Sequence, residues 1–391
     1  LLFSYDNTYR AIMNQSHHKD TPINGISILI PCAGRLPLLE KLLQSVKVAR
    51  NNFQLPTEVL LIDNSQSNEQ KTVQSLAELF DAKYYLGNNN ISQKRNFGAM
   101  QARYNVILFL DSDCYVDINI LREHYNEYSN PDTAGCLGLL NFVGKDTNTW
   151  KSVEQTGVLE CFSIPVRQSS TSWGPTANIS FRRDIFLEVG GFDPRFSRPG
   201  GEDVDIGFKI TDAGWRLSCN SRAIAYHTKE TWASFWQVYD RFIRYGTADA
   251  LLLKKHPARS IIDFPLNSQY AILLIIFASF WSTSVGTSSL LVPIFWATLS
   301  VLIYASIKWL SKNSKNNSWL VSFEELILLT SLDAGRLIGA IKYRERSALF
   351  KRIIFFEEQL EMDWSGVSLS SFASATALII TLFFFSLFLG L

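Results

Sequence analysis

The chain has 391 residues, a formal net charge of +1 and a hydrophobic content of 47%. This length allows two domains, or one domain followed by a membrane region. The near-neutral charge weighs against a nucleic-acid-binding protein that depends on many phosphate contacts. The five cysteines form no C-x-x-C pair, which favours reduced thiols in the cytoplasm over a disulfide framework or a zinc site.

The part of the chain after residue 25 alternates short apolar runs with amphipathic segments. The predicted strands are 26–31, 58–62, a weaker run at 83–86, and 106–110. The predicted helices between them are 37–51, 68–80 and 92–102. Strands that alternate with helices indicate an α/β fold with a mostly parallel, doubly wound sheet.

Polar side chains follow two of these strands at the point where each strand ends. Asp63 follows the run 58–62, and Asp111, Ser112 and Asp113 follow the run 106–110. Ligands of open α/β sheets bind outside the carboxyl ends of the strands. Carboxylate oxygens there suit Mg²⁺ or Mn²⁺ carrying a diphosphate. Asp and Ser are also ordinary turn residues, but two such strand ends at one edge favour a nucleotide site.

The later part of this region adds an acidic cluster and a histidine. The segment Gly200–Asp205 combines two glycines with three acids at the start of a predicted helix. The helix macrodipole explains one such acid more easily than three. His227 ends the apolar run 223–226, and a ligand role and a structural role are equally open for it.

Two long stretches near the C-terminus carry no charged residue: 44 residues from Phe264 to Ile307 and 28 from Trp364 to Leu391. A membrane helix needs about 20 apolar residues. We therefore expect spans at about 265–285, 288–309 and 369–391. Buried helices of a soluble core rarely run this long without a charge.

Lysines and arginines flank the three expected spans on one side, which predicts that this side and the large N-terminal domain are cytoplasmic. The apolar but charged segment 319–341 predicts an amphipathic helix at the membrane interface, with a buried or re-entrant helix as the alternative. The aromatic-rich segment 232–245 predicts core packing, with an interfacial helix as the alternative.

The motifs of residues 25–250 resemble, in order and spacing, those of glycosyltransferase family 2, the inverting nucleotide-sugar enzymes of the GT-A fold. The matching motifs are Ile28-Leu29-Ile30-Pro31, Ile62-Asp63-Asn64-Ser65, Lys94-Arg95-Asn96-Phe97-Gly98, Asp111-Ser112-Asp113, Gly191-Phe192-Asp193, Gly201-Glu202-Asp203-Val204-Asp205, Ala213-Gly214-Trp215 and His227. The resulting domain plan has an N-terminal extension (1–24), a GT-A domain (25–250, with a nucleotide-binding half 25–115 and an acceptor half 116–250) and a membrane region (251–391).

The resemblance implies a role for each matching residue. Asp203 is the expected base for the acceptor hydroxyl, and Glu202 orients that base or the acceptor. Asp113, His227 and Asp111 are the expected neighbours of a Mn²⁺ or Mg²⁺ ion, with Asp111 on the ribose or in indirect support. The remaining expected contacts with the nucleotide-sugar are Pro31, Cys32, Ala33, Arg35, Asp63 (to the base), Arg95 and Ser112. The expected acceptor-side residues are Trp173, Asn178 and Gly201.

The resemblance implies transfer of a sugar from a nucleotide-sugar, with uracil the usual base, to a hydroxyl of a lipid-linked or membrane-proximal glycan acceptor. The segment Gln237–Phe242 departs from the Gln-x-x-Arg-Trp motif of processive synthases by one extra residue and a Phe for the Trp. We therefore expect one transfer per encounter. A processive polysaccharide synthase, a non-catalytic nucleotide-sugar-binding subunit of a membrane complex and a nucleotidyltransferase are the alternatives.

Overall fold

The computed structural model describes residues 22–262 and 318–355, and the chain divides into two compact units. Unit 1 comprises residues up to 145 together with 159–231, and unit 2 comprises 146–158 together with the residues from 232 onward. The three expected membrane spans and nearly all of the expected N-terminal extension lie outside the described residues. Within the described ranges, no helix combines the length and apolar character that a membrane span requires.

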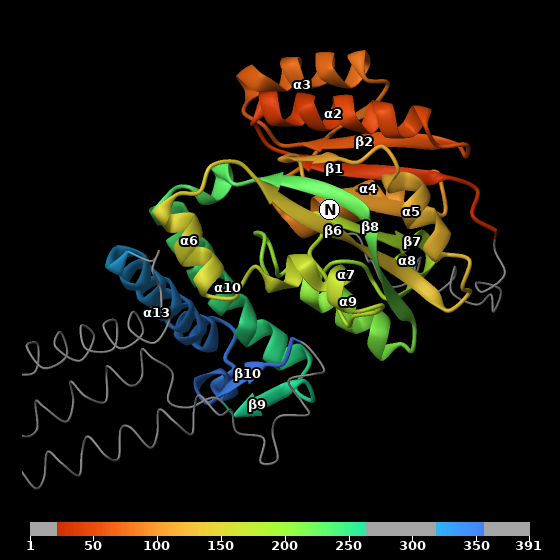
Figure 1. Ribbon diagram of the computed structural model, residues 1–391. Helices are drawn as coiled ribbons and strands as arrows, with labels where there is room; N and C mark the ends of the chain where they lie inside the picture. The colour runs from red at the N-terminus through yellow and green to blue at the C-terminus, as the bar shows by residue number, and fades with distance from the viewer. Residues whose placement is uncertain (1–21, 263–317, 356–391) are drawn as a thin grey trace, which may run out of the picture. The chain divides into compact units, whose positions relative to one another are not determined.

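Unit 1 begins with the predicted alternation of strands and helices (Figure 1). The elements of this first half are β1 (Ile26–Cys32), α2 (Leu36–Asn51), β2 (Thr57–Asp63), α3 (Ser67–Leu79), β3 (Lys83–Leu86), α4 (Ile91–Gln101) and β4 (Val106–Leu110). Every residue of β1 and of β4 is buried. This burial on both faces explains why the two strands are continuous apolar runs rather than alternating ones.

The second half of unit 1 completes one eight-stranded sheet of order β3-β2-β1-β4-β7-β6-β8-β5. Its strands are β5 (Cys114–Val116), β6 (Thr133–Val143), β7 (Asn178–Arg182) and β8 (Arg216–Thr228). Its helices are α5 (Ile120–Glu127), η1 (Glu160–Ser163), α7 (Ile164–Arg167), α8 (Arg183–Glu188) and α9 (Glu202–Asp212), and the turn η2 (Glu230–Trp232) follows β8 across the boundary with unit 2.

The sheet is mixed, although most of its strand pairs are parallel, as expected. Strands β3, β2, β1 and β4 pair in parallel, and β6 also runs parallel to β8. Strand β7, however, is antiparallel to both β4 and β6, and β5 is antiparallel to β8. The chain between β6 and β7 leaves unit 1, contributes a helix to unit 2 and returns, and β7 then enters the sheet in the direction opposite to β6.

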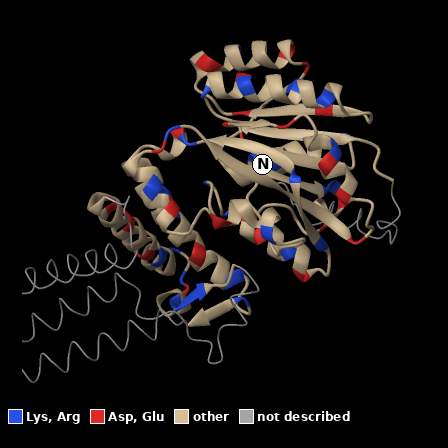
Figure 2. Ribbon diagram, viewed as in Figure 1, with Lys and Arg blue, Asp and Glu red and all other residues tan. Residues whose placement is uncertain are grey.

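Helices cover both faces of the parallel half of the sheet. Helices α2 and α3 bury their apolar stripes in one core cluster with Ile28 and Leu61. Helix α4 packs closely on the other face, because a Cβ atom on Gly98 would lie 2.9 Å from side-chain atoms of Leu29 and of Ile62. Acidic and basic residues are interspersed along α2 and α3 rather than sorted by sign (Figure 2).

A bulge in β8 sets the register of its last residues. Gly138 of β6 pairs with Asn220, but the next residue, Leu139, pairs with Ile224. Asn178 fills this irregularity, because its amide nitrogen donates to the carbonyls of Leu139 (3.0 Å) and of Ala223 (2.8 Å). A glycine is required at 138, where a Cβ atom would collide with that amide. The bulge therefore determines which β8 residues reach the end of the sheet.

Unit 2 is built around a close pair of helices, α10 (Phe235–Lys255) and α13 (Trp319–Lys342). The backbones approach where Gly246, Gly335 and Gly339 leave no room for a Cβ atom. The remaining elements are α6 (Asn148–Gln155), η3 (Arg346–Leu349) and the antiparallel pair β9 (Ser260–Ile262) and β10 (Lys351–Ile353). Arg336 is buried between Asp249 (2.9 Å) and Asp333 (3.2 Å).

Two sequence expectations fall within unit 2. Helix α13 occupies the segment expected as an amphipathic helix at 319–341, and the expected domain boundary near residue 250 falls inside α10, whereas the units divide at 231/232. In the aromatic segment, Trp232 and Phe242 are buried, as core packing requires, but Trp236 is 73% exposed.

Candidate active site

The carboxyl ends of the central strands bring the expected donor-side residues to one edge of unit 1. Cys32, the last residue of β1, pairs with Asp63, the last residue of β2. Strand β4 lies on the other side of β1 and ends one residue before Asp111. The convergence of Asp63 with the segment Asp111–Asp113, expected from the sequence, is therefore present in the fold.

Asp113 is held by two basic side chains. Its Oδ1 lies 3.3 Å from His227 Nε2, and its Oδ2 lies 2.6 Å from Arg35 Nη1. Burial alone would raise the pKa of Asp113, but His227 and Arg35 together hold it well below its usual range. Burial would lower the pKa of His227, and the charge and hydrogen bond of Asp113 raise it above its usual value.

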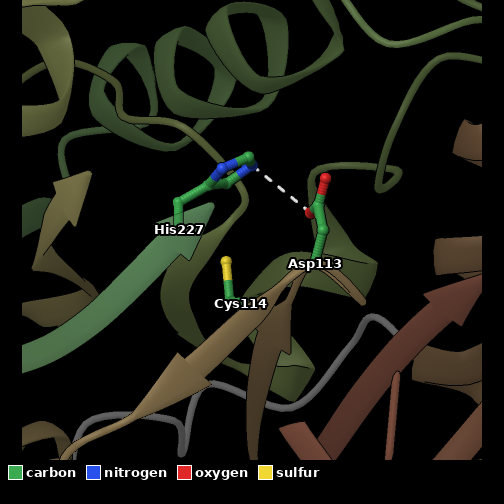
Figure 3. Close-up of side chains that lie close together, drawn as sticks. All are labelled: Asp113, Cys114 and His227. Carbon is green, nitrogen blue, oxygen red and sulfur yellow. Dashed lines mark ion pairs between the residues drawn. The ribbon is translucent and has the colours of Figure 1, made fainter. Parts of the chain in front are cut away.

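His227 reaches this position because Cys114 of β5 pairs with it across the antiparallel edge of the sheet. Its Nδ1 lies 2.8 Å from the carbonyl of Thr228, to which it donates when it carries the proton. A hydrogen bond from one ring nitrogen to a backbone carbonyl is the usual way to orient a metal-ligating histidine. Here it leaves Nε2 directed at Asp113. Asp113, Cys114 and His227 offer ligand atoms within 4.8 Å of one another (Figure 3).

Arg95 links the two acidic motifs of the site. Its guanidinium lies 2.7 Å from Glu202 Oε1 and 3.1 Å from Asp111 Oδ1, and its side chain is only 2% exposed. The sequence expectation placed Arg95 at the base or the diphosphate. The structure instead places it between two carboxylates, where it joins the end of β4 to the first turn of α9.

The acidic turn of α9 separates the roles of its two carboxylates. Glu202 is buried, and its Oε2 accepts a hydrogen bond from the backbone N–H of Gly200 at 2.6 Å. Asp203 is half-buried, and its carboxylate accepts a hydrogen bond from the backbone N–H of Val204 (2.9 Å). Burial and the neighbouring charge of Glu202 raise the pKa of Asp203 to about 7, against the opposing effect of Arg95. Such a carboxyl is suited to proton transfer near neutral pH.

A left-handed backbone makes this turn possible. Gly201 caps α9 with a φ of 91°, and Gly200 has a φ of 132°. Both values lie in the region that favours glycine. The double glycine thus serves the turn that presents Glu202 and Asp203, and Gly201 contributes backbone geometry rather than a side chain.

Asp63 has its carboxylate fully buried in this arrangement. Oδ1 accepts from the backbone N–H of Ser65 (2.8 Å) and from its hydroxyl, and Oδ2 accepts from the hydroxyl of Tyr84 (3.1 Å). The side chain of Asp63 has no exposed surface. It orients Ser65, whose hydroxyl accepts from the N–H of Gly34 at 2.7 Å.

Lys94 is a further polar residue of this edge that the sequence analysis did not assign. Its ammonium donates to the carbonyl of Cys32 (3.2 Å) and to the side chain of Asn64. Burial lowers its pKa to about 8. A lysine beside Arg95 on the buried side of α4 was the sequence signal that could have identified it.

The loop after β1 presents fewer side chains than expected. Pro31 and Cys32 are buried in the strand, whereas Ala33 and Arg35 are exposed. Gly34 and Arg35 both have a positive φ, 64° and 55°, and this turn starts α2 with the Arg35 guanidinium directed at Asp113. Ser112 is buried between the two aspartates.

The residues expected on the acceptor side are placed differently from one another. Asn178 is buried, and besides its two carbonyl contacts in the bulge, its Oδ1 lies 2.9 Å from His124 Nε2. Its side chain is therefore committed to the sheet. Trp173 is buried and packs against α9, where Gly207 leaves no room for a Cβ atom.

This chain matches a protein-family model and is similar to several known proteins. Residues 27–192 match the family model described as Glycosyl transferase family 2. Chondroitin synthase of Pasteurella multocida is 25% identical over 249 residues, which are 53% of this chain and 25% of that protein. Glucosyl-dolichyl phosphate glucuronosyltransferase of Haloferax volcanii is 25% identical over 207 residues, which are 47% of this chain and 65% of that protein.

Among solved structures, a mannosyltransferase from Pyrobaculum calidifontis in complex with GDP-Man and Mn2+ aligns with a TM-score of 0.49 and 14% identity, covering 86% of this chain and 92% of that chain. The chain spans less than two thirds of the length of either curated relative named above.

Proposed function

We propose that this chain, whose residues 27–192 form a glycosyltransferase family 2 domain, is an inverting glycosyltransferase that uses a nucleotide-sugar, a UDP-sugar in the first instance. The observation that carries the proposal is the arrangement of α9. Asp203 has a pKa of about 7 beside the buried Glu202, and Arg95 joins this turn to the end of β4. Transfer of a sugar from a nucleoside diphosphate requires a base for the acceptor hydroxyl close to the residues that hold the diphosphate.

Asp203 acts as the base in this mechanism. Its carboxylate takes the proton of the acceptor hydroxyl while the hydroxyl oxygen bonds to the anomeric carbon and the bond from that carbon to the diphosphate breaks. Attack from the side opposite the leaving group inverts the configuration, and no second carboxylate nucleophile is needed. Glu202 does not share this task, because Arg95 and the N–H of Gly200 hold it.

The residues present fit a hard divalent cation. A carboxylate oxygen of Asp113 and Nε2 of His227 face each other at 3.3 Å, and Asp111 is partly exposed beside them. This donor set suits Mn²⁺ or Mg²⁺. The ion, when bound, neutralises charge on the leaving diphosphate. Arg35 adds a positive charge beside Asp113, and Lys94 places another at the end of β1.

A membrane-associated, lipid-linked or glycan acceptor and a single transfer per encounter complete the proposal. The two charge-free stretches, 264–307 and 364–391, support about three spans with the catalytic domain in the cytoplasm. The name of the Haloferax volcanii relative includes a dolichyl phosphate, which supports a lipid-linked acceptor. The departure of Gln237–Phe242 from the motif of processive synthases supports non-processive transfer.

A screen of nucleotide-sugars tests the proposal. The full chain is heated with each donor and Mn²⁺ to detect thermal stabilisation, and the donors that stabilise it are then assayed for release of free nucleoside diphosphate. We expect release with at least one donor and its loss in Asp203→Asn. Asp205→Asn is the matched control, because Asp205 lies on the same helix but is paired with Lys209 at 2.9 Å. Binding of donor and Mn²⁺ without turnover of any donor would favour a non-catalytic subunit.

A further inference from the structure

Three side chains with different metal preferences meet where β5 and β8 pair. Asp113 precedes β5, Cys114 begins it, and His227 lies directly opposite Cys114 on β8. The three side chains point to the same side of the two strands (Figure 3). Their ligand atoms lie within 4.8 Å of one another, and all three residues are buried. The function proposed above uses the oxygen and nitrogen donors but gives the sulfur no role.

We propose that Asp113, Cys114 and His227 form a binding site for a soft divalent cation of the Zn²⁺ type, with the sulfur of Cys114 as a direct ligand. The proposal rests on the proposed function only in that Asp113 and His227 would be shared with the catalytic cation. Zinc therefore competes with Mn²⁺ for this position.

The geometry is close to a tetrahedral site. Bonds of about 2.0–2.3 Å from zinc to nitrogen, oxygen and sulfur place neighbouring ligand atoms roughly 3.3–3.8 Å apart. The pair His227 Nε2 and Asp113 Oδ1 already lies at 3.3 Å. The sulfur needs to approach its partners by at most about 1 Å, which a side-chain rotation allows.

The type of ligand atom distinguishes zinc from Mn²⁺ and Mg²⁺. Thiolate and imidazole suit zinc, whereas carboxylate oxygen suits Mn²⁺ and Mg²⁺. Mn²⁺ would therefore be held chiefly through the carboxylate of Asp113, with His227 beside it and Cys114 as a neutral thiol. When zinc binds, a sulfur–zinc bond forms and the thiol proton passes to the buffer. Three protein ligands would leave a tetrahedral zinc ion one open position.

Cobalt(II) provides a direct readout, because sulfur coordination gives it a charge-transfer absorption in the near ultraviolet. The full chain is titrated with CoCl2 and then with ZnCl2 as the competitor. We expect the absorption in the wild-type protein and its loss in both Cys114→Ser and Cys114→Ala. Cys219→Ser is the matched control, since Cys219 is a free, half-buried cysteine on β8 and should leave the band unchanged.

Zinc affinity gives a second measurement. Loss of an outer-shell partner alone weakens a metal site by about 10–100-fold, so loss of a direct ligand should weaken zinc binding by at least about tenfold. Mn²⁺ binding should change less than about twofold in Cys114→Ser. A wild-type protein that turns over donor with Mn²⁺ but shows no sulfur–cobalt band would overturn the inference alone. A band that depends on Cys114 in a chain that transfers no sugar would refute the proposed function and leave the inference standing.

Discussion

Replacement of Asp203 by asparagine should make the protein more stable and less active at the same time. The pKa of this carboxyl rises from 3.8 to about 7 in the folded protein, chiefly because of burial and Glu202. The ionised form is therefore disfavoured in the fold by about 4 kcal/mol, at ~1.4 kcal/mol per pKa unit. Asp203 is only half-buried, so solvent screening reduces the expected effect to about 2 kcal/mol.

The sign of the pH dependence follows from the direction of the shift. Because the folded pKa is raised, the wild-type protein loses stability as the pH rises from about 4 to about 7, while the asparagine variant does not. Urea unfolding should therefore show Asp203→Asn to be more stable at pH 8 by about 2 kcal/mol, with a difference that shrinks toward zero near pH 4. Asp205→Asn should shift the other way at pH 8, because it breaks the ion pair with Lys209.

Activity gives the second half of this test. Release of nucleoside diphosphate by the wild-type protein should increase with pH up to about 7, as Asp203 ionises. Loss of the base should reduce the rate by about 10²–10⁴-fold and remove this pH dependence. An asparagine variant that is destabilised at pH 8 and transfers sugar at the full rate would refute both the burial argument and the assignment of the base.

Three further changes test other contacts of the site and of unit 2. Arg95→Lys should reduce turnover and lower stability by about 3 kcal/mol in urea unfolding, because a lysine cannot bridge both carboxylates. Arg35→Gln should tighten the binding of Mn²⁺ in the absence of donor, because the guanidinium no longer competes for Asp113. The electron paramagnetic resonance of free Mn²⁺ measures this binding, and an unchanged affinity would contradict the expectation. Arg336→Met should destabilise unit 2 by about 3–5 kcal/mol, because two buried aspartates lose their partner, and an unaltered urea midpoint would argue against that network.

The sequence predicted the parts of the fold that depend on local pattern. Apolar runs and amphipathic periods gave the four parallel strands and their helices within one or two residues. The direction of β7 was not predictable in this way, since it depends on a connection that passes through the other unit. The bulge in β8 likewise depends on Asn178, a residue that is distant in sequence.

The candidate site shows the same division. The ends of β2 and β4 could be located from the sequence, but the direction of a side chain at a strand end could not. Asp63 is thus turned inward to Ser65 and Tyr84, although its position in the motif was expected. Arg95 was expected at the nucleotide and lies between Asp111 and Glu202, because the approach of α9 to β4 is a tertiary contact.

The interleaving of the two units limits how this chain can be divided. The polypeptide leaves unit 1 after Lys145, contributes α6 to unit 2 and returns at Leu159. A shortened protein that ends at Thr231 would keep the whole candidate site but would strip α6 of its packing partner α13, exposing the buried Trp150 and Val153. Two large apolar side chains left in water cost about 3–6 kcal/mol and favour aggregation. A soluble catalytic fragment should therefore be sought by replacing residues 146–158 with a short polar linker, not by truncation alone.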